Sequence, residues 1–279
     1  MNIYRARSTT LSASLFLAMA VIVPPARAGD TSVPPARPDA RLPSLERKLQ
    51  EASARFLQSN TPMKPFELYL VGFHPMKDRP DIQMEAHHYC HQVNEDFAQC
   101  VLFDGNTKDA NLNGVEYIIS EKLFETLPAE EKKYWHPHNG EILSGQLVAP
   151  GIPEAAERSF MEKQMNSYGK TWHFWNTGGE HAPRDRLPLG DPSLGWSFNR
   201  EGEAQPGLIE ARDRKLKVDS NELRRKRTGL EKSARPQSGV DALKDKFDRS
   251  TRAIPGVVDK GEAKSRSDGV STERKNDGG

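Results

Sequence analysis

The sequence lacks the short motifs that most directly reveal an enzyme. It contains no GxSxG nucleophile elbow, no phosphate-binding P-loop and no GxGxxG dinucleotide fingerprint. Repeats of fixed period are absent too, which excludes a solenoid or a propeller. No motif therefore names a reaction or a substrate, and the question of an enzymatic activity stays open at this point.

An excess of charge of one sign is also missing. Lysine and arginine number 40 against 39 aspartates and glutamates, a formal net charge of +1. Removal of an N-terminal segment that contains Arg5, Arg7 and Arg27 would bring the charge to −2. Proteins dedicated to nucleic acids carry a strongly basic surface. We therefore expect no nucleic-acid partner.

Long hydrophobic runs are missing as well. The longest, Leu11–Val23, has 13 residues, whereas a membrane-spanning helix needs about 20. Arg5 and Arg7 precede this run and the small-x-small triplet Ala26-Arg27-Ala28 follows it, an order typical of a secretory signal over residues 1–28. We therefore predict export to the periplasm or the medium, with an uncleaved N-terminal anchor as the alternative. A lipoprotein anchor is excluded because no cysteine lies near the cleavage point.

Both cysteines of the chain lie in one block, residues 85–103, EAHHYCHQVNEDFAQCVLF. Two apolar and aromatic runs flank the polar loop Asn94-Glu95-Asp96, a pattern typical of a β hairpin. Folding at this loop places Cys90 opposite Cys100, where Cβ atoms lie about 4.5–5.5 Å apart and a bridge needs little strain. An exported chain meets an oxidising environment. We therefore predict a disulfide between Cys90 and Cys100, with two buried thiols as the alternative.

The domain layout follows from composition and periodicity. We expect a proline-rich linker over residues 29–43, one folded domain over residues 44–223, and a basic segment with a disordered tail over residues 224–279. The domain is expected to be α+β: a mixed or antiparallel sheet with β hairpins, packed by two to three helices. The expected helices include residues 44–58 and 154–168 and the expected strands residues 115–119, 141–148 and 171–176, while residues 66–73 fit either a buried strand or a short helix.

The end of the chain is poor in apolar residues. Beyond Ser233 the only aromatic residue is Phe247, and Gly, Ser, Lys, Asp and Arg dominate. Such a composition buries too little apolar area to offset the entropy of ordering the chain, so residues 233–279 are predicted to be disordered. The basic run Arg224–Arg227 is expected on a solvated helix face, with contact to an anionic lipid or polysaccharide as the alternative.

The segment WHPHNGE, residues 135–141, is the candidate metal site. Asn139-Gly140 favours a two-residue type I′ turn, which would set His138 opposite Glu141 with His136 on the same face. Two imidazoles and a carboxylate suit a first-row divalent metal ion with open coordination positions. Additional candidate ligands elsewhere in the chain are Glu85, His88 and His173.

These residues also allow other interpretations. The spacing HxHxxE is short enough to arise by chance, and strand histidines more often form hydrogen bonds in a polar pocket or face solvent. The spacing also resembles the metal motif of cupins, but helices expected after Ser120 and Pro153 argue against a plain cupin barrel. Cys90 beside His88 could act as a nucleophile, or the two cysteines in thiol redox chemistry. The tryptophans could line a pocket or contact lipid rather than fill the core.

Several long blocks of the sequence resemble the oil body-associated protein family. Taken in order, they are EAHHYCHQVNEDFAQCVLFD, GVEYIISEKLFETLPAEEKKYWHPH, LVAPGIPE, YGKTWHFW and LPLGDP. The resemblance extends over about Phe66 to Leu223, and the length and order of the blocks make it more specific than any short motif above.

This resemblance implies one α+β domain and, in plants, association with the surface of lipid droplets. It implies no catalytic activity and no cofactor. We therefore expect an exported, non-catalytic protein that contacts lipid or another hydrophobic partner, with a metal-binding protein or metal-dependent enzyme as the alternative. The chain departs from the family in its signal segment, its Asn139-Gly140 pair and its long charged tail. The polar positions that match the family blocks are Glu85, His87, His88, Asn94, Glu95, Asp96, His136, His138, Glu141 and His173.

Overall fold

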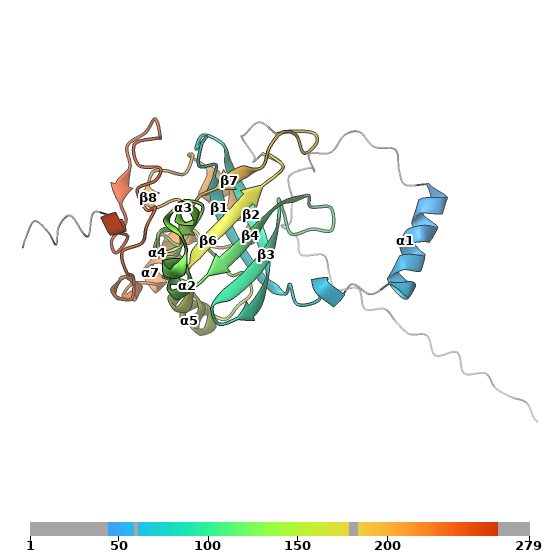
Figure 1. Ribbon diagram of the computed structural model, residues 1–279, viewed down its shortest axis with the longest axis horizontal. Helices are drawn as coiled ribbons and strands as arrows, with labels where there is room; N and C mark the ends of the chain where they lie inside the picture. The colour runs from blue at the N-terminus through green and yellow to red at the C-terminus, as the bar shows by residue number, and fades with distance from the viewer. Residues whose placement is uncertain (1–43, 59–60, 179–183, 262–279) are drawn as a thin grey trace, which may run out of the picture.

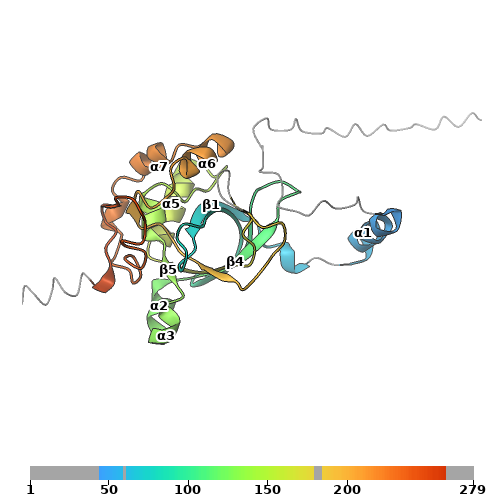
Figure 2. The ribbon, with the colours of Figure 1, turned by 90° about the horizontal axis from the view of Figure 1, so that it is seen from above.

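A single antiparallel sheet forms the centre of the molecule. The computed structural model describes residues 44–58, 61–178 and 184–261; the predicted signal segment and linker lie outside them. Seven strands pair in the order β1-β2-β3-β4-β6-β5, with β7 also paired to β6, and Figure 2 shows the sheet curled round on itself. The strands are β1 (Leu68–Pro75), β2 (Gln83–Asn94), β3 (Phe97–Phe103), β4 (Leu112–Ile119), β5 (His136–Pro137), β6 (Tyr168–His173) and β7 (Ser193–Gly195).

Most of the helices gather on one side of this sheet, which confirms the expected α+β class (Figure 1). Sequence signals mark several of their ends: the hydroxyl of Ser120 accepts from the backbone N–H of Leu123 at the start of α2, and α5 begins directly after Pro153. The helices are α1 (Leu45–Leu57), α2 (Glu121–Thr126), α3 (Ala129–Lys132), α4 (Asn139–Leu143), α5 (Glu154–Gln164), α6 (Leu208–Leu216) and α7 (Ser220–Lys226). Short 3₁₀ turns occupy Thr61–Met63 and Leu230–Lys232, and β8 (Arg200–Glu201) pairs with β9 (Arg252–Ala253).

Alternation along the strands gives the sheet two distinct faces. Strand register places Leu70 of β1 opposite His88 of β2, and Cys100 of β3 opposite Glu116 of β4. Because alternate residues point to opposite sides of a sheet, these four share one face, which we call the site face. The main apolar cluster covers part of it, where Leu70 packs with Ile142 of α4, Met161 of α5 and Met165 directly after α5.

The predicted hairpin and its disulfide are present. Cys90 pairs with Cys100 across β2 and β3, and their sulfur atoms are bonded. The turn differs by one residue from the expectation, because a bulge after Gln92 brings Asn94 opposite Phe97. The ambiguous segment at residues 66–73 forms the buried strand β1.

Helix α1 is amphipathic but its leucines are not buried. Ser44 caps it by accepting from the backbone N–H of Arg47. Leu45, Leu49 and Leu57 are 74, 60 and 84 % exposed, and Figure 1 shows the helix apart from the sheet. Neither α1 nor any other described helix is both long and apolar enough to cross a bilayer.

The predicted tight turn at Asn139-Gly140 and the strand over residues 141–148 are wrong. Asn139 instead begins α4, and the chain rejoins the sheet only through a bridge between Val148 and Val71. A Cβ atom on Gly140 would lie 2.6 Å from Oδ1 of Asn199. The glycine is therefore needed for close packing against a distant segment rather than for a turn.

The prediction of disorder is wrong for residues 233–261, which pack against the domain; residues 262–279 lie outside the described residues. Val240, Leu243 and Ile254 are at most 3 % exposed, and Nε1 of Trp196 donates to the carbonyl of Gly239. The basic run is not wholly solvated either. Arg227 is 1 % exposed and donates to two backbone carbonyls and to a buried glutamate of α5.

Candidate metal site

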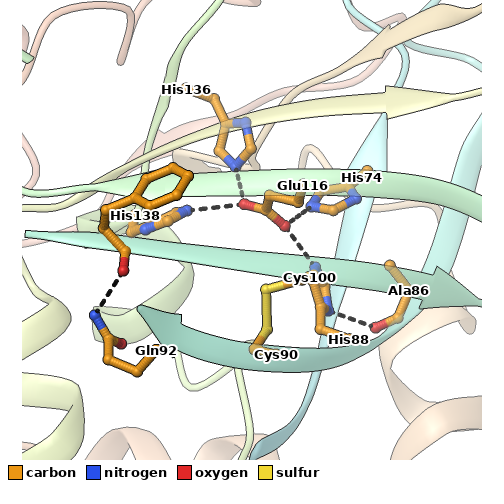
Figure 3. The surroundings of a disulfide bond; sticks show 10 residues. His74, Ala86, His88, Cys90, Gln92, Cys100, Glu116, His136 and His138 are labelled. Carbon is orange, nitrogen blue, oxygen red and sulfur yellow. Dashed lines mark hydrogen bonds and ion pairs between the residues drawn. A yellow bond between two sulfur atoms is a disulfide. The ribbon is translucent and has the colours of Figure 1, made fainter. Parts of the chain in front are cut away.

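The site face gathers histidines around one carboxylate. Glu116 of β4 is 2 % exposed, and ring nitrogens surround both of its oxygens (Figure 3). Its Oε2 lies 2.8 Å from Nε2 of His88 and 3.9 Å from Nε2 of His74. Its Oε1 lies 3.3 Å from Nε2 of His138 and 3.5 Å from Nε2 of His136. Within the described residues, every ion-pair partner of this carboxylate is an imidazole, and none is a lysine or arginine.

Hydrogen bonds fix the tautomers of two of these histidines. Nδ1 of His88 lies 3.1 Å from the carbonyl oxygen of Ala86, which can only accept, so this nitrogen carries a proton. Nδ1 of His138 lies 2.7 Å from the hydroxyl of Ser167, which itself donates to the carbonyl of Gln164 and therefore accepts from the ring. In both rings Nε2 then points at the shared carboxylate. A lone pair facing a carboxylate oxygen needs a cation between the two atoms, either a second ring proton or a metal ion.

His136 is positioned by the pairing of β5 with β6. Its backbone pairs with Gly169 of β6, and its ring is fully buried. Neither of its ring nitrogens has a hydrogen-bond partner among the described residues. A Cβ atom on Gly169 would lie 2.1 Å from Oε1 of Glu116 and 2.6 Å from Nε2 of His136. The glycine therefore preserves the space in which these two groups meet.

Two further buried side chains extend the cluster. Nδ1 of His74 lies 2.9 Å from Nε2 of His173, so the second ring orients the first. The donor atoms of His74, Glu116 and His136 lie within 4.8 Å of one another, and so do those of His136, His138 and Glu141. Ligands about 2.0–2.2 Å from one ion lie roughly 3–4 Å apart. Small side-chain movements would bring either group onto one cation.

Burial sets the ionisation of these side chains. It lowers the pKa of His136 to about 3 and that of His173 to about 4, and holds the pKa of His74 well below its ordinary range. Burial opposes ionisation of Glu116 too, but hydrogen bonds from the surrounding rings outweigh it and hold the pKa of Glu116 well below its usual value. Burial, with the nearby charge of Glu116, raises the pKa of Glu141. His74, His136 and His173 are therefore neutral imidazoles and Glu116 is a carboxylate, the forms in which these groups bind metal ions.

The candidate ligands named from the sequence are separated into two groups by the sheet. His88, His136, His138 and Glu141 come together on the site face, and His173 reaches the cluster through His74. The pairing of β5 with β6 and the start of α4 bring them together, and the predicted tight turn at residues 139–140 plays no part.

Glu85 belongs to the opposite face of the sheet. Its carboxylate lies 2.9 Å from Nε2 of His87 and 3.2 Å from Nζ of Lys215 in α6, and Nδ1 of His87 lies 2.7 Å from the hydroxyl of Tyr69. Because consecutive residues of a strand point to opposite faces of a sheet, His87 and His88 lie on opposite faces. Glu85 is therefore outside the cluster.

Sequence reasoning missed the central residue Glu116 and the histidine His74. A signal for both was present in the pattern of alternation. Glu116 is the one charged residue in the apolar strand β4, and it lies on the same face as Cys100. His74 follows Leu70 at even spacing in β1. The pairing of Cys90 with Cys100 fixes only the register of β2 with β3, so placing both residues on the side of His88 also needed the registers of β1 with β2 and of β3 with β4.

Comparison with known proteins identifies the family. Residues 60–231 match a family model described as Protein of unknown function (DUF1264). Oil body-associated protein 2A of Arabidopsis thaliana is 36% identical over 74% of this chain and 81% of its own length. The chain belongs to the oil body-associated protein family. Oil body-associated protein 1B of the same plant is 37% identical over 69% of the chain and 77% of its own length. Oil body-associated protein 1A of Zea mays is 37% identical over 76% of the chain and 86% of its own length.

This membership corrects the predicted location. The relatives are named for association with oil bodies, which contradicts the expectation of a periplasmic or secreted protein. The family resemblance drawn from the sequence blocks is confirmed at the level of the family. No solved structure matches the chain.

Proposed function

We propose that the protein binds a first-row divalent metal ion on the site face, through Nε2 of His88 and His138 and the carboxylate of Glu116. The observation that carries this proposal is the convergence of two Nε2 atoms on one buried carboxylate while both Nδ1 protons are used elsewhere. Metal-binding histidines are oriented in this way, by donating their other N–H to a carbonyl or hydroxyl.

Additional donors are within reach of the same position. His136, whose ring nitrogens have no hydrogen-bond partner in the described part of the chain, lies beside Oε1 of Glu116. Two or three imidazoles with one carboxylate suit iron, zinc, manganese or cobalt better than magnesium or calcium, which prefer oxygen ligands.

Metal analysis of the full chain tests this proposal. The protein would be purified without a histidine tag, reconstituted with Fe²⁺, Zn²⁺ or Mn²⁺, desalted and measured by elemental analysis, with about one ion per chain expected. His88→Ala should abolish retention of the ion. His91→Ala is the matched control, because it removes an imidazole from the same strand on the opposite face. A wild-type chain that retains no metal, or equal retention in both variants, would contradict the proposal.

We also propose that the protein contacts a lipid surface in a non-catalytic role. The names of its relatives support an oil-body partner, and α1 presents leucines to solvent. An amphipathic helix with an exposed apolar side binds the boundary between lipid headgroups and acyl chains.

Flotation with phospholipid-coated triglyceride droplets tests lipid contact. The wild-type chain should float with the droplets, and Leu49→Glu should weaken this association by placing a charge on the apolar side of α1. Leu189→Glu provides a matched control, since Leu189 is 66 % exposed and Leu49 60 %. Absence of flotation of the wild-type chain, or an equal effect of the two substitutions, would contradict the role given to α1.

A further inference from the structure

A small cavity opens beside the proposed metal ligands. Its volume is about 30 Å³, and His88, Glu116 and His138 all contribute to its wall. A space of at least 10–15 Å³ on this measure holds a water molecule. The cavity therefore has room for one very small molecule next to the ligand atoms, and no room for a substrate the size of a sugar or an acyl chain.

Most of the remaining wall is apolar, although His74, Glu141, Gln92 and Gln164 also contribute to it. Leu70, Ala98, Ile118 and Leu147 line the cavity, together with one half of the disulfide, Cys90. No lysine or arginine of the described chain lines it. An anion would lose its hydration there without a compensating positive side chain, which makes its entry costly. The lining therefore favours an uncharged occupant.

The ligand set adds a chemical constraint. The proposed ligands are two histidines and one glutamate, His88, His138 and Glu116. Two histidines and one carboxylate with open coordination positions are typical of non-haem iron(II) sites that take dioxygen. Because His88, His138 and Glu116 all line the cavity, a small molecule inside it would lie next to an ion held by these residues.

We propose that the site holds iron(II) and that the apolar cavity admits dioxygen to it. This inference rests on the proposed metal site and deepens it, by naming the metal and the class of its second ligand: an uncharged diatomic molecule. The size of the cavity, its mostly apolar wall and the ligand set agree on this occupant.

Nitric oxide is the probe for this inference, because it is an uncharged diatomic molecule that gives iron(II) a distinctive electron paramagnetic resonance signal. The full chain would be loaded with Fe²⁺ without oxygen, its iron content measured, and then titrated with nitric oxide. We expect a signal that reaches about one nitric oxide per bound iron. The bulkier 4-phenylimidazole should leave the signal unchanged, because the cavity has no room for it.

A cavity-filling variant localises the effect. Ala98→Val should retain iron but bind nitric oxide at least about tenfold more weakly, a change of about 1.4 kcal/mol. Ala211→Val, which overfills an equally buried position in α6 outside the cavity, is the control and should behave like the wild type.

The outcomes separate the two proposals. Failure to retain any metal would overturn the proposed function and this inference with it. Iron retained without a nitric oxide signal, displacement of nitric oxide by 4-phenylimidazole, or unchanged binding in a folded Ala98→Val would overturn this inference alone. If Ala98→Val does not fold, the wild-type comparison of nitric oxide with 4-phenylimidazole still decides.

Discussion

Two neighbouring histidines of β2 have opposite environments. His87 lies between the hydroxyl of Tyr69 and the carboxylate of Glu85, so each of its ring nitrogens has its own partner. His88 uses one nitrogen for a carbonyl and directs the other at Glu116, which three further histidines also approach. Both residues are 4 % exposed. Burial and residue type are the same, and only the direction of the partners differs.

This difference separates a structural network from a candidate site. On the face of His87 the donors and acceptors pair one to one, and Lys215 balances the charge of Glu85. On the site face several nitrogens compete for the oxygens of Glu116, and the described residues provide no lysine or arginine to balance its charge. An added cation would complete the second arrangement but has no place in the first.

Replacing the acid on each face gives the largest expected contrast. Glu116→Gln should weaken metal affinity on the order of 1000-fold, or about 4 kcal/mol, because it removes a charged ligand, and loss of an outer-shell partner already costs 10–100-fold. Glu85→Gln, the same change on the other face, should leave affinity unchanged. Competition with a chromogenic chelator measures both. Equal losses would mean that the two faces do not differ as described.

A buried acid that belongs to neither face is expected to make the free energy of unfolding depend on pH. Glu203 is fully buried; one of its oxygens accepts from the backbone N–H groups of Asn199 and Arg200, and the other has no partner among the described residues. Burial raises its pKa from 4.5 to about 7. Between these values the unfolded chain releases a proton that the folded chain keeps. The free energy of unfolding should therefore fall as pH rises through this window, on the order of 3 kcal/mol in all, and level off above pH 7.

Glu203→Gln should remove this slope, since the amide oxygen still accepts the two backbone bonds and does not titrate. Urea denaturation of metal-free protein at pH 5, 6, 7 and 8 measures it. Any slope that persists in the variant belongs to other groups, including those of the site face. An unchanged slope would show that the carboxyl group of Glu203 is not the cause.

The hairpin of β2 and β3 was predictable because its determinants are local. Asn94-Glu95-Asp96 fixes the turn to within one residue, and strand alternation then aligns Cys90 with Cys100 whatever the rest of the chain does. The same parity assigns His88 to the side of the disulfide. One of the three proposed ligands, His88, could thus be placed from one short block.

The failed predictions concern residues whose role depends on distant partners. Asn139-Gly140 has the strongest local preference for a turn, but close packing of Gly140 against Asn199 overrides it. The end of the domain has an average composition typical of disorder, yet a few spaced residues such as Val240 and Ile254 are enough to anchor it. The average composition of a segment does not show which of its single apolar residues pack against the rest of the domain.

Loss of the disulfide tests how firmly the two faces are held apart. Cys90 and Cys100 are buried on the site face, and their bond ties β3 to β2, the strand that carries His87 and His88. Replacing both with alanine should lower the free energy of unfolding by about 2 kcal/mol, since the closed loop is short. Urea denaturation with and without a reducing agent measures this, and the reductant should affect only the wild type. A destabilisation that the reductant does not reproduce would come from packing instead.

The smallest effect is expected on the face of His87. Tyr69→Phe removes the hydroxyl that contacts Nδ1 of His87 but keeps the ring that stacks on Tyr89. The loss should be about 1 kcal/mol, the usual contribution of one hydrogen bond, and metal affinity should not change because the hydroxyl lies across the sheet from Glu116. Urea denaturation and chelator competition on the same preparation measure the two quantities. A fall in metal affinity comparable to that of His88→Ala would show that the faces are coupled through the backbone of β2, and the separation of a structural network from a metal site would then be wrong.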